Sequence, residues 1–386
     1  MYFDFIVLSV EDFFEARFGF LSNTGQMIGD DETCLDEAVA WLLRSIEKTG
    51  GNGSSMGYAF LSGWRSAYPE TTGYIVCTLL KLADIKDISF LEIARKQGDW
   101  LLSIQTENGG IVGGALGAMK EPIVFNTGQV LHGLNSLYKI TGELKYLEGG
   151  LKAGEFLVSC MDESGCFVRH LHNNIVHAYN SRTAWALMEL GRLAGRKDLE
   201  EVAHRNIRWT LSQQQKNGFF LHNNFAAGRP ALTHSIGYVL RGILESYLLS
   251  GEKDYLDAIY RTAERLIRKY GVDRRLVAEI GSDWEDLSSH LCLTGYAQLA
   301  IIFLKLFRIN KDPRYLNLAL HLVDDLKKHQ YLGNASPDFR GAVKGSFPIY
   351  GRYAPLQFPN WATKFFIDAL LLKMEVMKEY EDRLLG

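Results

Sequence analysis

Side chains that can transfer protons lie in a few short stretches of the sequence. Tyr179, His172, Glu70 and His222 are the candidate catalytic residues, because phenol, imidazole and carboxyl groups can each take up or release a proton. Near them lie aromatic rings that can stack on a sugar, and amides and cations that can bind hydroxyl or carboxylate groups. The candidate substrate-binding residues are Trp64, Arg65, Tyr68, Asn173, Asn174, His177, Arg182, Asn223, His234, Trp284, Glu285, Tyr350, Arg352, Asn360 and Trp361.

Two reaction types would use these side chains differently. In the first, Tyr179 and a histidine abstract the proton next to a uronate carboxylate, while Asn and Arg side chains stabilise the enolate-like state, as in β-elimination or C5-epimerisation. In the second, Glu70 and another carboxylate hydrolyse a glycosidic bond as an acid and a base or nucleophile. The second carboxylate would be Asp283, Glu285 or Asp286. We expect the first type, and a glycan-binding protein without catalysis is a further alternative.

Motifs for other chemistries are missing from the sequence. It has no Gly-rich dinucleotide or phosphate-binding motif and no Gly-x-Ser-x-Gly nucleophile motif. Its histidines are not spaced as His-Glu-x-x-His, and no Cys-x-x-Cys pair accompanies them. We therefore predict neither a metal nor another cofactor. A terpenoid-type cyclase would need an acidic motif facing an aromatic cavity, and we find none in a suitable place.

Composition indicates a globular protein that does not bind nucleic acid. The 386 residues include 42 Lys and Arg and 45 Asp and Glu, a net charge of −3, and 47% are apolar. A nucleic-acid binder would normally carry a basic excess. No apolar run is long enough for a membrane-spanning helix, and the first residues lack the basic region of a signal peptide. We therefore predict a cytoplasmic protein whose partner is an oligo- or polysaccharide substrate; its oligomeric state is left open.

A repeat of about 55 residues organises the chain. Six long apolar runs each begin with Ser, Thr or Asn beside a small residue, which suits the capped start of a buried helix. The starts are Thr71-Thr-Gly-Tyr74, Asn126-Thr-Gly-Gln129, Asn180-Ser-Arg-Thr183, His234-Ser-Ile-Gly-Tyr238, Leu293-Thr-Gly-Tyr296 and Pro359-Asn-Trp-Ala362. Because the period is too long for one helix, each repeat is expected to hold a helix pair.

Six amphipathic runs alternate with the apolar ones. They cover residues 35–49, 90–105, 146–161, 199–214, 255–270 and 315–330, each with charges along one face. The pattern predicts an all-α (α/α)6 toroid of six inner and six outer helices, spanning residues 34–386, with residues 1–33 as an extension packed on it. The long connections 50–70, 106–126, 162–180, 215–235, 271–293 and 331–359 would gather on one face, where the inner helices begin, and carry the site.

These runs resemble the (α/α)6 carbohydrate-active enzymes over residues 35–380. The segments from Thr127-Gly-Gln129 to Tyr146 and from Ser181 to Leu187 are similar to unsaturated glucuronyl and rhamnogalacturonyl hydrolases. In those hydrolases a catalytic Asp stands where this chain has Asn126, which cannot act as an acid. The content of Tyr, His, Asn and Arg is more similar to polysaccharide lyases and uronyl epimerases. The resemblance thus implies a toroid acting on a uronate-containing glycan.

Overall fold

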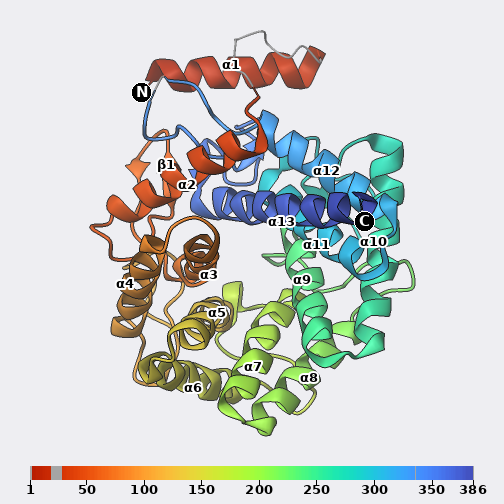
Figure 1. Ribbon diagram of the computed structural model, residues 1–386. Coiled ribbons are helices and arrows are strands. Elements are labelled where there is room, and N and C mark those ends of the chain that lie inside the picture. The colour runs from red at the N-terminus through yellow and green to blue at the C-terminus, as the bar shows by residue number, and fades with distance from the viewer. Residues whose placement is uncertain (1, 19–27, 335, 386) are drawn as a thin grey trace.

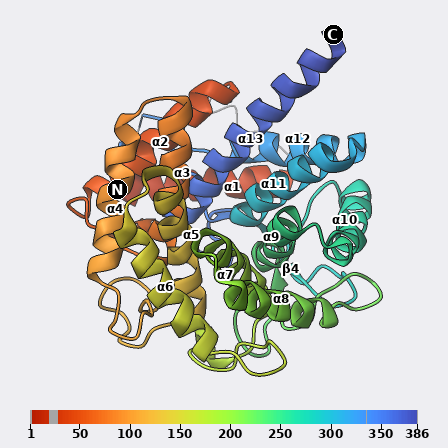
Figure 2. The same ribbon diagram turned by 60° about the horizontal axis from the view of Figure 1, so that its bottom comes forward.

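The computed structural model describes residues 2–18, 28–334 and 336–385. Within these ranges lie thirteen α-helices, twelve of which form two concentric layers (Figures 1 and 2). The outer layer contains α2 (Asp31–Glu47), α4 (Ser89–Ser103), α6 (Leu144–Ser159), α8 (Lys197–Ser212), α10 (Lys253–Asp273) and α12 (Pro313–Lys328). The inner layer contains α3 (Pro69–Ile85), α5 (Val124–Thr141), α7 (Ser181–Ala194), α9 (Thr233–Ser250), α11 (Leu293–Asn310) and α13 (Asn360–Leu385).

The inner helices close into a ring. Each packs against the next along the chain, and α13 returns to pack against both α2 and α3. Asn360, the first residue of α13, joins the two ends: its Nδ2 donates to the Ser55 carbonyl oxygen (2.8 Å) and to Thr71 Oγ1 (2.8 Å). The predicted (α/α)6 toroid is therefore confirmed.

The small residue of the repeat lets neighbouring inner helices approach closely. A Cβ added at Gly73 would lie 2.5 Å from the Gln129 carbonyl oxygen, and one at Gly128 would lie 2.4 Å from Thr183 Oγ1. Both distances are too short for real atoms, so only glycine fits at these two crossings. The 55-residue period thus records the points at which one inner helix touches the next.

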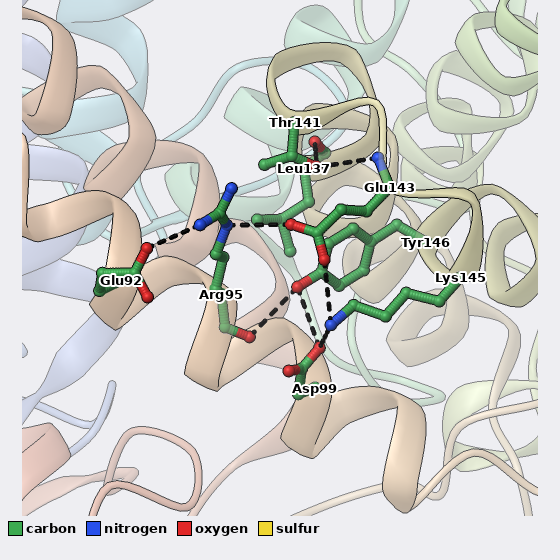
Figure 3. Close-up of polar contacts among 8 residues, drawn as sticks. All are labelled: Glu92, Arg95, Asp99, Leu137, Thr141, Glu143, Lys145 and Tyr146. Carbon is green, nitrogen blue, oxygen red and sulfur yellow. Dashed lines mark hydrogen bonds and ion pairs between the residues drawn. The ribbon is translucent and has the colours of Figure 1, made fainter.

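The outer helices are joined by charged side chains in contact with water. Figure 3 shows one such network between α4 and the start of α6. Arg95 Nε lies 3.0 Å from Glu143 Oε1, and Lys145 Nζ lies 2.6 Å from Asp99 Oδ1. Tyr146 donates a hydrogen bond to the same Asp99 oxygen (2.9 Å). Because the charged groups of these pairs are between about one third and one half exposed, each pair contributes at most about 1 kcal/mol to stability.

Short antiparallel strands join neighbouring long connections on one face of the ring. The strands are β1 (Gly57–Ala59), β2 (Gly63–Trp64), β3 (Ala231–Leu232), β4 (Glu279–Ile280), β5 (Leu291–Cys292), β6 (Ser346–Phe347) and β7 (Gln357–Pro359). β1 pairs with β2 and β7, β3 with β4, and β5 with β6. The connections are thereby held in place around the starts of the inner helices.

Helix α1 (Tyr2–Phe18) lies outside the two layers (Figure 1). Its buried Asp12 forms an ion pair with Lys344 and accepts a hydrogen bond from the Ile349 backbone N–H (2.6 Å). Within the predicted extension 1–33, residues 1 and 19–27 lie outside the described residues, and α2 already begins at Asp31. None of the described helices has the length and hydropathy that crossing a membrane requires.

Candidate functional site

A pocket of about 160 Å³ lies where the inner helices begin. Its walls come from the starts of α3, α5, α9 and α13 and from the connections between outer and inner helices. Most of its described lining side chains are aromatic, and Glu70 is the one carboxylate among these described residues. The lining residues are Met56, Tyr68, Glu70, Tyr74, Phe125, His172, Tyr179, Phe225, His234, Tyr238, Tyr353 and Trp361.

Glu70 is an acid held out of water beside a phenol. It stands in the first turn of α3, directly after Pro69, and is only 9% exposed. The Tyr68 hydroxyl donates a hydrogen bond to Glu70 Oε2 (2.6 Å). Burial raises the pKa of Glu70 to about 7, although the Tyr68 hydrogen bond and the charge of Arg182 both act to lower it. Glu70 can therefore release or take up a proton at neutral pH.

Arg182 lies behind the pocket rather than in its lining. Its Nε donates to Gln129 Oε1 (2.6 Å), and the guanidinium is 5.7 Å from the centre of the Tyr74 ring and 5.3 Å from that of Tyr238. These two tyrosines line the pocket. Arg182 thus supports the tyrosine wall and adds a positive charge behind it, which favours the ionised form of Glu70.

Two histidines of the pocket are kept neutral by burial. The Gln298 amide donates to His234 Nδ1 (2.7 Å), which leaves the proton on Nε2. Burial, with a smaller contribution from the charge of Arg182, lowers the pKa of His234 to about 3. Burial also lowers the pKa of His172. At neutral pH both rings can therefore donate and accept hydrogen bonds without carrying a charge.

Tyr179 is oriented by the connection that holds it. The ring of His177 stacks on it with centroids 4.3 Å apart, and each ring nitrogen of His177 contacts a backbone carbonyl oxygen (3.0 and 2.8 Å). Asn173 Nδ2 donates to the Phe225 carbonyl oxygen (2.8 Å), while Asn174 is exposed. His177 and Asn173 thus hold the wall of the pocket, and none of these three polar residues is in its lining.

His222 and Asn223 do not lie at the pocket. His222 is exposed, has a left-handed backbone (φ 55°) and packs near Trp209 of an outer helix, with ring centroids 6.3 Å apart. Asn223 is buried, and its carbonyl oxygen accepts a hydrogen bond from Ser235 Oγ (2.6 Å). The backbone at His222 turns the imidazole toward the outer layer, so the structure separates it from the other candidate catalytic residues.

Trp64 and Arg65 are used to hold the first and last connections together. Trp64 Nε1 donates to Asp338 Oδ1 (2.9 Å), and its ring stacks on Trp41 with centroids 5.4 Å apart. Arg65 Nη1 donates to Gln357 Oε1 (3.1 Å). Both side chains are thereby bonded to the 331–359 connection, and neither lines the pocket.

The acidic stretch 283–286 also lies away from the pocket. Trp284 is buried, and its Nε1 donates to the Asn217 carbonyl oxygen (3.1 Å). Glu285 is exposed and its Oε2 accepts a hydrogen bond from the Asp283 backbone (3.0 Å), while Asp286 forms an ion pair with a lysine of α10. The stretch is a turn tied to the outer layer, so it brings no second carboxylate to Glu70.

The last connection and the first turn of α13 contribute to the pocket, and the connection also lines a neighbouring cavity. Trp361 lines the pocket, and its Nε1 donates to the Tyr353 hydroxyl (2.7 Å). Tyr350 and Arg352 line the adjoining cavity instead. Asn360, next to Trp361, is used in ring closure.

Sequence reasoning missed much of the aromatic lining. Tyr74 and Tyr238 follow the glycine at the start of an apolar run, where the sequence predicts side chains buried between the inner helices. The signal that could have identified them is a polar hydroxyl one residue after the point of closest helix approach. The other residues missed are Met56, Phe125, Phe225 and Tyr353.

No group of three or more His, Cys, Asp or Glu side chains among the described residues is arranged to hold a metal ion. The described lining of the pocket offers one carboxylate and two histidines that are not grouped together, and its other side chains are mostly aromatic.

Solved structures share this fold across nearly the whole chain. An unsaturated glucuronyl hydrolase specific for heparin matches with a TM-score of 0.71 and 18% identity over 91% of this chain and 99% of its own. The unsaturated glucuronyl hydrolase from Bacillus sp. GL1 matches at 0.70 and 14%, covering 88% and 96%. Cellobiose 2-epimerase from Bacillus thermoamylovorans B4167 matches at 0.70 and 11%, covering 89% and 98%.

No protein-family model matches the chain, and a search of curated protein sequences found no match either. At these low identities the structural likeness establishes the fold. The resemblance expected from the sequence is confirmed at that level, because the chain has the (α/α)6 toroid fold shared by these carbohydrate-active enzymes.

Proposed function

We propose that the chain is a carbohydrate-active enzyme that transfers a proton to or from a sugar unit, with Glu70 as the group that exchanges the proton. The observation that carries the proposal is the state of the Glu70 carboxyl group. It is buried in the first turn of α3, accepts a hydrogen bond from Tyr68 and has a pKa raised to about 7. A general acid or base is most effective when its pKa lies near the working pH. The aromatic lining suits the faces of a sugar ring.

The surrounding groups suit a proton transfer. The Tyr68 phenol stabilises the ionised form of Glu70 after it has given up its proton. Burial and the nearby Glu70 charge raise the pKa of Tyr179 well above its ordinary value, so its phenol stays protonated and can donate a hydrogen bond to a developing negative charge. Neutral His234 can donate in the same way.

A lyase or C5-epimerase type of reaction on a uronate-containing glycan fits these groups better than hydrolysis by paired carboxylates. Paired hydrolysis needs two carboxyl groups across the scissile bond, and the described lining offers Glu70 alone. Cellobiose 2-epimerases and unsaturated glucuronyl hydrolases, which share the fold, act on saccharides by name, and this supports the sugar as substrate. The small volume suits one sugar unit at a time.

A panel of uronate polysaccharides and oligosaccharides in D₂O tests the proposal. A lyase would produce unsaturated products that absorb in the ultraviolet, whereas an epimerase would incorporate deuterium at carbon without new absorbance. Glu70→Gln should abolish either signal, and Glu285→Gln, its matched control outside the pocket, should keep it. New reducing ends with neither new ultraviolet absorbance nor deuterium at carbon would favour hydrolysis. Binding without any reaction would favour a non-catalytic glycan-binding protein.

A further inference from the structure

A second cavity of about 560 Å³ adjoins the pocket. Phe225 and Tyr353 line both spaces, and both rings pack against His234, with centroids 5.4 and 5.5 Å from it. The two cavities are therefore neighbours across a shared aromatic wall. A chain of sugar units with one unit in the pocket would place a following unit in the second cavity.

The charges of the second cavity differ from those of the pocket. Arg229 and Arg352 line the cavity, whereas no Lys or Arg is among the described residues that line the pocket. Both arginines are exposed, and neither guanidinium has an ion pair or a hydrogen bond with another described residue. Among the described residues of the cavity lining Glu279 is the single acidic one, so this described lining has a net positive charge. The remaining lining is apolar apart from Tyr350 and Tyr353.

Both arginines stand on connections that backbone hydrogen bonds hold in place. The segment carrying Arg352 is closed by Gly351 N–H donating to the Pro348 carbonyl oxygen (2.8 Å) and by Leu356 N–H donating to that of Ile349 (2.8 Å). The segment carrying Arg229 is closed by its own N–H donating to the Ala226 carbonyl oxygen (3.2 Å). Little backbone ordering would therefore accompany the binding of a ligand.

We propose that this cavity is a subsite for an anionic sugar unit, whose carboxylate or sulfate is bound by Arg229 and Arg352 while a neighbouring unit occupies the pocket beside Glu70. Guanidinium groups bind carboxylate and sulfate through paired charge-assisted hydrogen bonds, and two of them that line one cavity without a hydrogen-bond partner among the described side chains suit such a group. The proposal rests on the proposed function and deepens it: the negative charge of the substrate is recognised one unit away from the reacting ring.

Binding measured by calorimetry in the Glu70→Gln background tests the subsite, because turnover is then suppressed. The probes are a hyaluronan tetrasaccharide, which carries carboxylates only, a chondroitin 6-sulfate tetrasaccharide, which adds sulfate, and the neutral chitotetraose. Arg352→Ala and Arg229→Ala should each weaken binding of an anionic tetrasaccharide by about tenfold or more and change chitotetraose binding less than about twofold. Tighter binding of the sulfated probe would identify sulfate, and equal binding of both anionic probes would identify the carboxylate.

Three further variants sharpen the test. Arg352→Lys keeps a charge but loses the paired hydrogen bonds, so its affinity should lie between those of the parent and Arg352→Ala. Glu279→Gln removes the repelling charge and should strengthen anionic binding a few-fold. Arg275→Ala, an exposed arginine outside the cavity, should change nothing.

Two results would overturn the subsite: anionic affinity unchanged in Arg352→Ala and Arg229→Ala, or no preference for the anionic probes, including no binding of them up to about 10 mM. The outcome is separable from that of the proposed function. Turnover that survives Glu70→Gln would refute the proton-transfer role, while charge-dependent binding at the two arginines would still stand.

Discussion

Glu70 and Glu245 are two buried carboxylates on inner helices with opposite acid–base properties. They are 9% and 8% exposed, respectively. Glu245 Oε1 lies 2.5 Å from Arg241 Nε and 2.7 Å from Lys305 Nζ, and these charges outweigh burial and lower the pKa of Glu245 to about 2. Glu70 is hydrogen-bonded by the neutral Tyr68 and has a pKa of about 7.

The comparison shows that burial alone does not make a carboxylate an acid–base group. Both glutamates lose water, but Glu245 gains two cations in direct contact, whereas the cation that acts on Glu70 among the described residues is the more distant Arg182. The two cations keep the Glu245 carboxylate ionised at neutral pH. The Glu70 carboxyl group, without a described cation in contact, can exchange its proton there. Glu70 should therefore control activity, and Glu245 should control stability.

Glu70→Gln should cause the largest effect, a loss of about 10²- to 10⁴-fold in kcat/KM on whichever uronate substrate the panel identifies. The substitution should also stabilise the fold at alkaline pH. Because the folded pKa of Glu70 is raised, its contribution to stability is present below about pH 4.5 and is lost as the pH rises through about 7.

Urea unfolding at pH 5 and pH 8 measures this second effect. The non-titrating glutamine should make the variant more stable than the parent by about 1–3 kcal/mol at pH 8 and by little at pH 5. A Glu70→Gln protein that is less stable at pH 8 would show that the carboxylate has a partner that compensates its charge.

Glu245→Gln should have the opposite profile, with a loss of up to about 3–5 kcal/mol in the free energy of unfolding at pH 7, because Arg241 and Lys305 would be left half-buried without a counter-charge. The folded pKa of Glu245 is lowered, so its contribution is present above about pH 4.5 and is lost as the pH falls toward 2. The double variant Glu245→Gln/Lys305→Met should recover part of the loss. A Glu245→Gln protein that is folded but inactive would contradict the assignment of stability to Glu245 and of activity to Glu70.

Tyr68→Phe should shift the pH dependence and leave the fold intact. The phenol stabilises the ionised carboxylate, so its removal should raise the pKa of Glu70 further and move the pH–rate inflection from near 7 to a more alkaline value. We expect kcat/KM at pH 7 to fall about tenfold. Tyr260→Phe on α10 is the control and should leave the profile unchanged. An unshifted inflection would mean that the titrating group is not Glu70.

The architecture could be predicted from the sequence because its signal is periodic. The apolar runs recur with the helix crossings, and Gly73 and Gly128 mark two of those crossings directly. Glu70 and Tyr68 could be placed for the same reason, since they directly precede an inner run and must lie at its start. The stretch 283–286 could not be placed, because its turn is held by contacts with the outer layer that the sequence does not reveal.

Two identical triplets show the limit most clearly. His172-Asn-Asn and His222-Asn-Asn look equivalent in the sequence, but the structural equivalent of His222 is His170. Both His170 and His222 have left-handed backbones, with φ of 54° and 55°. The His170 carbonyl oxygen accepts from the N–H of Val124, the first residue of α5 (2.9 Å), and that of His222 accepts from the N–H of Ala178, just before α7 (2.8 Å). Position within the repeat, not local sequence, therefore decides which histidine reaches the pocket.

The smallest effect predicted here separates these two histidines. His172→Ala should lower kcat/KM by about 3- to 10-fold, because His172 lines the pocket as a neutral hydrogen-bonding group and not as the group that exchanges the proton. His222→Ala should leave kcat/KM within about twofold of the parent, since its exposed ring packs near Trp209. Equal losses in both variants would place the second triplet at the site as well. A loss for His172→Ala as large as that for Glu70→Gln would instead make His172, and not Glu70, the acid–base group of the pocket.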